Sequence, residues 1–246
     1  MSRAALALLF AVSSAACAQT ATQTYEPTVG QEGKDVVWVP TPQAVVNKML
    51  DLAKVTANDY VIDLGSGDGR TVITAAKRGA RALGIEYNPK MVEISQRAAE
   101  KEGVSARAQF MKADLFETDF SKATVSTMFL LPDINLKPGT RIVSNTFTMG
   151  DWKADETAEL GANGGCDSSW CTALLWIVPA KVGGNYRTPQ GEVSLKQEFQ
   201  MLTGTLKTGG KTFALRGKVN GEEVSFSAGG KQYRGKLNGK DLQLNQ

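Results

Sequence analysis

The chain has 246 residues, 42% hydrophobic and 22% charged, which excludes a collagen-like or disordered protein and leaves room for one large domain or two modest ones. The 28 basic and 25 acidic residues give a net charge of only +3. Because phosphate-based recognition needs a basic stripe, we expect no nucleic-acid partner. The absence of histidine excludes histidine-based acid–base catalysis, Ser-His-Asp and Cys-His sites and histidine-ligated metals, and no metal site is predicted.

Residues 1–18 have the three parts of an export signal. Arg3 supplies the positive start, residues 4–12 form an apolar run too short to span a bilayer, and residues 16–18 (Ala-Cys-Ala) fit the cleavage pattern. We therefore expect cleavage before Gln19, an exported, periplasmic protein, and no transmembrane segment in the mature chain. The alternative is a disordered or membrane-anchoring tail.

The three cysteines extend this interpretation. A lipid anchor at Cys17 is disfavoured, because Ser14 stands where lipoprotein signals usually carry leucine. After cleavage, Cys166 and Cys171 remain, and an exported chain with two thiols so close together favours a local disulfide. Two free thiols and half of a metal site are the alternatives, but a metal would need two further ligands.

The mature chain begins with a polar stretch and continues with alternating strands and helices. Residues 19–38 predict an extended arm. Within residues 39–152, apolar periodicity predicts helices and strands in this order: helix 42–53, strand 60–64, helix 70–78, strand 82–85, helix 89–102, and strands 106–111, 124–131 and 141–146. This alternation predicts a Rossmann-like α/β domain with a mostly parallel sheet covered on both faces.

One connection departs from that pattern. Residues 131–139 are too few for the usual crossover between parallel strands. Either the helix between the fourth and fifth strands is missing, or those strands meet in another geometry.

The spacing of apolar residues changes in the last third of the chain. Residues 153–190 are interpreted as a connector that carries the two cysteines. From residue 191 to 246 apolar residues alternate with polar ones, and Gly-Gly and Asn-Gly dipeptides separate the runs. Such spacing is typical of consecutive hairpins, so we expect an antiparallel β-meander, either a small barrel or one curled sheet.

A glycine-rich turn follows the first predicted strand. Gly65 and Gly67 alternate with polar residues between Asp63 and Asp68, in a position where a ligand can approach the backbone and the start of the next helix. A dinucleotide fingerprint would need glycine where this chain has Arg70, which disfavours an NAD-dependent oxidoreductase. Acidic residues suit a cationic amino group better than a pyrophosphate.

Two further acids follow the next two strands. Glu86 comes about twenty residues after the turn, where an acid can accept hydrogen bonds from ribose hydroxyls. Asp114, after the third strand, can accept from an adenine amino group while a nearby backbone N–H donates to the ring. All three elements fall at the carboxyl ends of strands, where open α/β sheets bind ligands.

These motifs together resemble a known class of enzymes. The series D-L-G-S-G-D-G-R, G-I-E-Y-N-P and D-L-F resembles the class I S-adenosylmethionine-dependent methyltransferases. The P-T-P-x-x-V-V stretch before it and the later T-F-T-M-G-D-W resemble small bacterial methyltransferases akin to the FAM173-type lysine methyltransferases. The resemblance covers residues 39–152. No Asn/Asp-Pro-Pro-aromatic motif follows the fourth strand, where the chain has Asp133 and Asn135.

The resemblance implies a cofactor and its contacts. S-adenosyl-L-methionine would be held at its methionine part by the glycine turn, at its ribose by Glu86 and at its adenine by Asp114 and Leu115. The residues implied as cofactor-binding are Thr41, Asp63, Gly65, Ser66, Gly67, Glu86, Tyr87, Asp114 and Leu115. The implied activity is methyl transfer to a protein lysine or a small molecule, and no catalytic residue is assigned.

A rival interpretation follows from the export signal. The methyl donor is made in the cytosol, and a charged, water-soluble molecule does not cross a membrane unaided. The alternative function is therefore an exported, non-catalytic binding protein that retains a methyltransferase-like fold.

Overall fold

The structure is a computed structural model that describes residues 25–34, 36–128 and 136–245. The predicted export signal, Cys17 and the two polar residues Asp133 and Asn135 lie outside the described residues. No helix within the described ranges is both long and apolar enough to cross a bilayer.

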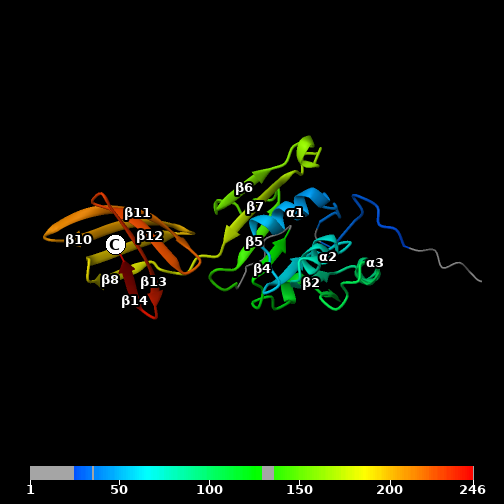
Figure 1. Ribbon diagram of the computed structural model, residues 1–246, viewed down its shortest axis with the longest axis horizontal. Coiled ribbons are helices and arrows are strands. Elements are labelled where there is room, and N and C mark those ends of the chain that lie inside the picture. Colours follow the sequence, from blue (N-terminus) through cyan, green and yellow to red (C-terminus); the bar gives the residue numbers. More distant parts are fainter. Residues whose placement is uncertain (1–24, 35, 129–135, 246) are drawn as a thin grey trace, which may run out of the picture.

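The described residues of the first part of the molecule form seven strands and three α-helices (Figure 1). In chain order these elements are α1 (Gln43–Leu52), β1 (Tyr60–Leu64), α2 (Arg70–Lys77), β2 (Arg81–Glu86), α3 (Pro89–Lys101), β3 (Ala108–Lys112), β4 (Val125–Met128), β5 (Arg141–Asn145), β6 (Glu156–Glu159) and β7 (Thr172–Ile177). Their order across the sheet is β3-β2-β1-β4-β5-β7-β6. The first five strands are parallel and β7 is antiparallel to both neighbours, so the predicted mostly parallel sheet is confirmed.

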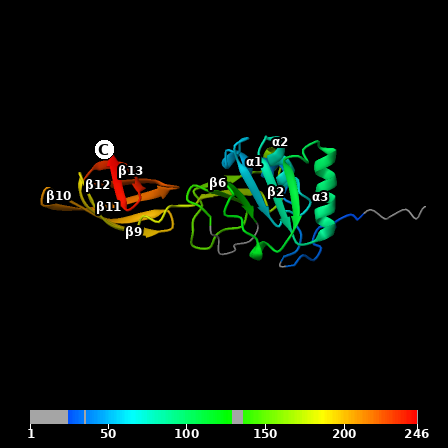
Figure 2. The same cartoon turned by 90° about the horizontal axis from the view of Figure 1, so that it is seen from below.

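The central strands bury side chains on both faces of this sheet. Val61 of β1 packs in the same cluster as α1, α2 and α3, whereas Ile62 packs in a second cluster. That second cluster draws Phe120, Met149 and Trp152 from loops. Figure 2 shows α1, α2 and α3 at the end of the molecule away from the C-terminus. The sheet is therefore covered on both faces, but the three helices belong to the first cluster and loop residues contribute to the second.

The short connection between the fourth and fifth strands joins parallel neighbours. Val125 of β4 is in register with Arg141 of β5, and residues 136–140, the described part of the connection, contain no helix. The sequence left two alternatives open: a missing helix between these strands, or an unusual strand geometry. The described residues favour the missing helix, because β4 and β5 pair as ordinary parallel neighbours.

The segment interpreted as a connector, residues 153–190, contains strands of both sheets. β6 and β7 extend the first sheet, and β8 (Gly184–Thr188) pairs with the first strand of the second sheet. β7 is an apolar run that fills the sheet interior, and its Trp176 is almost completely buried. β6 and β8 are short and mostly polar, so no alternating pattern marks them as strands.

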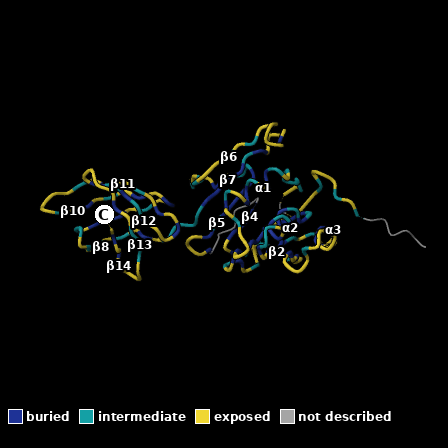
Figure 3. Tube along the Cα trace, in the orientation of Figure 1, coloured by how far each residue is buried: buried dark blue, intermediate teal, exposed yellow. Residues whose placement is uncertain are grey.

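The second sheet is an antiparallel meander in which every strand pairs with the next. After β8 it comprises β9 (Gly191–Glu198), β10 (Met201–Thr208), β11 (Lys211–Asn220), β12 (Glu223–Ala228), β13 (Lys231–Asn238) and β14 (Asp241–Asn245). The first and last strands lie next to each other, and Gln190 Nε2 donates to the Leu244 carbonyl at 3.0 Å. Buried and exposed residues alternate along the strands (Figure 3), as the two-residue period predicted, and the sheet curls into a nearly closed barrel.

The barrel and the first sheet lie side by side along the long axis of the molecule (Figure 1). The Ala180 N–H donates to the Gly221 carbonyl at 2.7 Å, and Gln200 Nε2 donates to the Lys153 carbonyl at 2.8 Å. Trp152 stacks on Phe199 with ring centroids 5.9 Å apart. These few contacts anchor the barrel beside the loop that follows β5.

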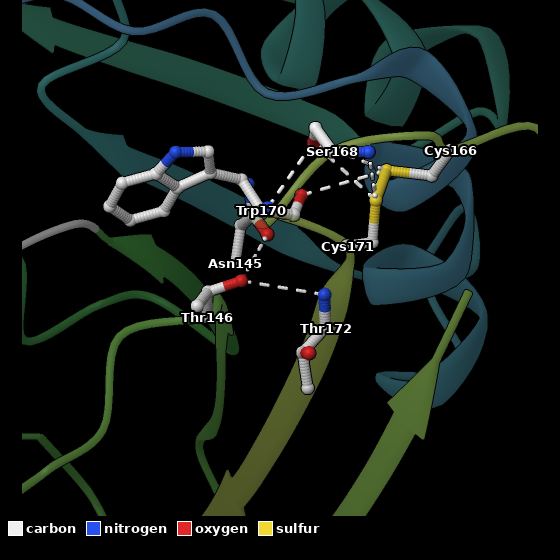
Figure 4. The surroundings of a disulfide bond; sticks show 7 residues. All are labelled: Asn145, Thr146, Cys166, Ser168, Trp170, Cys171 and Thr172. Atoms are coloured by element: carbon white, nitrogen blue, oxygen red, sulfur yellow. Dashed lines mark hydrogen bonds between the residues drawn. A yellow bond between two sulfur atoms is a disulfide. The ribbon is translucent and has the colours of Figure 1, made fainter. Parts of the chain in front are cut away.

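Cys166 and Cys171 form the expected disulfide at the tip of the β6–β7 hairpin (Figure 4). Both sulfurs belong to the cluster that contains α1, and a Cβ built on Gly165 would lie 3.3 Å from Ala44 Cβ at the start of that helix. On the other side of the hairpin, Trp170 stacks on Phe147 with ring centroids 5.3 Å apart. The disulfide therefore braces the hairpin between α1 and the loop after β5.

Replacing both cysteines with serine is expected to lower the free energy of unfolding by about 2 kcal/mol, the value for closing so short a loop. The melting temperature should fall by about 4–8 °C in a thermal scan followed by circular dichroism. Wild-type protein treated with a reductant should show the same shift. An unchanged melting temperature in both samples would mean that the bridge adds no stability.

Candidate cofactor site

A pocket opens at the carboxyl ends of β1, β2 and β3. All nine residues that the sequence analysis assigned to cofactor binding line it: Thr41, Asp63, Gly65, Ser66, Gly67, Glu86, Tyr87, Asp114 and Leu115. Parallel strands bring these residues together because their carboxyl ends meet at one edge of the sheet. The structure thus places the predicted residues in one pocket, while their roles toward a cofactor remain predictions.

The glycine turn leaves β1 and starts α2. Gly65, Gly67 and Gly69 have φ angles of 80°, 54° and 80°, which residues with a Cβ seldom adopt. The N–H groups of Gly65 and Ser66 both donate to the Ile85 carbonyl, at 2.9 and 3.0 Å, and hold the turn against β2. The turn therefore lines the pocket at the start of α2, and Gly65 is its exposed residue.

Glu86 links the glycine turn to the loop after β2. Its Oε2 accepts from the Gly67 N–H and its Oε1 accepts from the Asn88 N–H, both at 2.9 Å. Each carboxylate oxygen can accept a second hydrogen bond. The carboxylate is thereby fixed in position and still has the capacity to accept from a pair of hydroxyl groups.

Asp63 is a buried acid at the end of β1. Burial raises its pKa to about 7, the nearby charges of Glu86 and Asp68 act in the same direction, and a hydrogen bond donated by the Thr127 hydroxyl opposes them. A cationic ligand group would relieve this unfavourable environment. The pocket therefore suits a ligand that carries positive charge, as the acids of the turn predicted.

Asp68 has a partner of its own within the turn. Arg70 Nε donates to both of its carboxylate oxygens at 3.0 Å, and Arg70 Nη1 donates to the Thr41 carbonyl at 2.8 Å. From the sequence, we expected the acids of the turn to suit a cationic ligand. Because Arg70 balances the charge of Asp68, Asp63 is the more direct partner for such a ligand.

Asp114 caps the short 3-10 helix η1 (Leu115–Glu117). Its Oδ1 accepts from the Phe116 N–H at 3.0 Å, and its Oδ2 forms an ion pair with Lys34. The hydrogen bond donated by Lys34, together with that of the Phe116 backbone, lowers the pKa of Asp114. This carboxylate is held ionised, so both of its oxygens can accept hydrogen bonds.

The N-terminal arm supplies a wall of the pocket that sequence reasoning missed. The Gly30 N–H donates to the Trp38 carbonyl at 2.8 Å, and the Trp38 N–H donates to the Gln31 carbonyl at 2.9 Å, which closes the arm into a loop. The Trp38 indole packs on the glycine turn so closely that a Cβ on Gly67 would lie 2.5 Å from Nε1. No periodic signal marks this arm, so only the P-T-P motif at its end pointed to the site.

Three pocket residues from the middle of the sheet were also missed. Thr127 and Met128 end β4, and the almost fully buried Asn145 ends β5. Thr146 follows with a φ of 65° and donates through Oγ1 to the Asn145 amide oxygen at 3.0 Å. The acids were predicted because ligand-binding residues follow the carboxyl ends of parallel strands. The same rule, applied to the fourth and fifth strands, would have predicted these three residues.

Comparisons with known proteins agree with this site. A profile described as the ANTKMT methyltransferase domain matches residues 63–156. A protein-lysine N-methyltransferase from Saccharolobus islandicus is 44% identical over 137 residues, which cover 51% of this chain and 85% of that protein. The adenine nucleotide translocase lysine N-methyltransferase from Mus musculus is 33% identical over 104 residues, 38% of this chain and 45% of the relative.

A solved structure shares the fold of the first sheet. The crystal structure of an RNA methyltransferase from Salinibacter ruber in complex with S-adenosyl-L-homocysteine is 42% identical, covers 58% of this chain and 96% of that chain, and superposes with a TM-score of 0.52. The first sheet therefore has the fold of a class I S-adenosylmethionine-dependent methyltransferase. Within that class, the chain belongs to the ANTKMT methyltransferase family. The profile match ends before β7, so the barrel lies outside it.

Proposed function

We propose that this chain binds S-adenosylmethionine in the pocket at the carboxyl ends of β1, β2 and β3. The supporting observation is the convergence of Asp63, Glu86 and Asp114 on one pocket around the glycine turn. Glu86 accepts from the ribose hydroxyls, Asp114 accepts from the adenine amino group, and the turn holds the methionine part. The cofactor supplies a methyl group on a sulfonium, and the chain orients it and excludes water.

The positive charge of the cofactor is met by Asp63. This carboxyl lies among Glu86 and Asp68 and is buried, so its ionised form is unfavourable without a cation nearby. Bringing an ammonium or sulfonium group into the pocket favours the ionised form. Asp63 thereby couples cofactor binding to the loss of a proton.

We further propose that the methyl acceptor is a lysine side chain of a protein. Support comes from the two relatives described above, whose names identify them as lysine methyltransferases. A lysine ammonium must lose its proton before it can attack a methyl group, and this chain has no histidine to accept it. Proton loss then depends on a carboxylate, a tyrosine or water at the pocket mouth.

Export to the periplasm is part of the proposal. The disulfide at Cys166 and Cys171 supports it, since stable disulfides belong to oxidising compartments. The export signal itself lies in residues 1–18. Fractionating cells that express the chain and probing each fraction for the protein and for methyl transfer tests this: active protein confined to the cytosol would contradict export.

The test of function has two steps. Isothermal titration calorimetry of the purified full chain with S-adenosylmethionine should show binding at one site. The loaded chain should then transfer a labelled methyl group to proteins of a cell extract, and hydrolysis of those proteins should release methyllysine. Binding without transfer would favour the non-catalytic binding protein, and transfer to RNA alone would contradict a lysine acceptor.

A further inference from the structure

The side chain of Lys34 reaches from the N-terminal arm into the part of the pocket that we assign to adenine. Its Nζ pairs with Asp114 Oδ2 and lies 5.2 Å from the ring centroid of Tyr87 and 5.9 Å from that of Phe116. These distances are typical of cation–π contacts. Lys34 thus contacts both an acid and two aromatic rings at one point of the pocket.

In the adenine subsite that we propose, the ring would use Asp114 and Tyr87 as well. Its amino group requires the Asp114 carboxylate, and its flat faces require the apolar surfaces that Tyr87 and the η1 turn offer. Asp114 Oδ1 accepts from the Phe116 N–H, and Oδ2 holds Lys34. The ammonium and the adenine ring would therefore compete for the Asp114 carboxylate and the face of Tyr87.

Resting on the proposed function, we infer that Lys34 sets the affinity for the cofactor by occupying the adenine subsite, and that cofactor binding displaces it. The arm itself stays in place, because Trp38 packs on Gly67 and the Thr41 carbonyl accepts from Arg70. Only the flexible lysine stem has to turn away. The exchange breaks a partly exposed ion pair, since the side chains of Lys34 and Asp114 are 33% and 18% exposed.

The first test removes the ammonium and keeps the length of the stem. Lys34→Met is expected to bind S-adenosylhomocysteine about three- to tenfold more tightly than the wild type by calorimetry, the range of a surface ion pair plus a cation–π contact. Lys112→Met is the matched control: it removes an equal charge from the exposed end of β3. This control should bind as the wild type does, and both variants should keep the wild-type melting temperature.

The second test follows Lys34 in the wild-type chain. Mass spectrometry after brief labelling with an amine acetylating reagent should show faster modification of Lys34 when S-adenosylhomocysteine is present, because displacement breaks its ion pair. Labelling of Lys112 should not change. If Lys34 instead kept its place and only stabilised the arm, the bound ligand would cover it and slow its modification.

The outcomes separate this inference from the proposed function. If Lys34→Met binds the ligand as tightly as the wild type or more weakly, or if the ligand protects Lys34 from labelling, then the displacement of Lys34 is wrong while the cofactor site stands. If neither the wild type nor the variant binds S-adenosylhomocysteine, the proposed function itself fails and the inference fails with it.

Discussion

Replacing Glu86 with alanine is expected to weaken S-adenosylmethionine binding by about 1–3 kcal/mol, or roughly 5- to 160-fold in Kd. The variant loses the acceptor for the ribose hydroxyls. It also leaves the N–H groups of Gly67 and Asn88 without their shared partner, so the turn and the loop after β2 are no longer fixed to each other. Calorimetric titration of the full chain measures the effect.

Two further variants separate charge from architecture. Glu86→Gln keeps one oxygen for a backbone N–H but turns an amide donor toward the other, so its affinity should lie between wild type and Glu86→Ala. Glu93→Ala removes a carboxylate from the exposed side of α3 and should bind as the wild type does. Equal affinities of Glu86→Ala and Glu93→Ala would contradict the ribose assignment.

The acids of this site could be predicted because their placement follows from strand order alone. A residue that ends a buried parallel strand lies at the same sheet edge as the end of the neighbouring strand, whatever the helices between them do. Asp63 and Glu86 illustrate this: β1 and β2 are in register from Tyr60 with Arg81 to Leu64 with Ile85, so the turn after one meets the end of the other.

The arm and the two small strands could not be predicted in the same way. Lys34 meets Asp114 across 80 positions of sequence, and nothing in the polar residues around it signals that distant partner. β6 has three exposed residues out of four, so its place in the sheet comes from pairing with β7 rather than from any apolar period. Contacts made by backbone or by single polar side chains leave no periodic trace in a sequence.

The covering of the first sheet is a third feature that the sequence predicted only in part. Alternating strands and helices predicted layers on both faces, and the buried residues confirm that both faces are covered. The sequence did not indicate that loop residues such as Phe120 and Met149 would help to cover the second face. Isolated apolar residues in loops become part of a core only through the tertiary fold, and pattern analysis assigns them to no element.

Asp63 should make the stability of the free protein fall as the pH rises from about 4 to about 7. The folded state holds a proton on this carboxyl up to about pH 7, whereas the unfolded chain releases it near 3.8, so above pH 4 the unfolded state is favoured progressively. The full difference is about 4 kcal/mol above pH 7. Urea unfolding of the wild type and of Asp63→Asn, followed from pH 4 to pH 8, measures it.

Asparagine keeps an oxygen that can accept from the Thr127 hydroxyl but cannot ionise, so Asp63→Asn should lack this pH-dependent loss and become the more stable protein at pH 8. Cofactor binding supplies an independent measurement. Titrations near pH 6.5 in buffers of different ionisation enthalpy should show that the wild type releases up to one proton when it binds S-adenosylmethionine, because the cofactor's positive charge favours ionised Asp63. Asp63→Asn should release none. Parallel stability curves for the two proteins, together with equal proton release, would show that Asp63 is already ionised in the free pocket and that cofactor binding is not coupled to the loss of its proton.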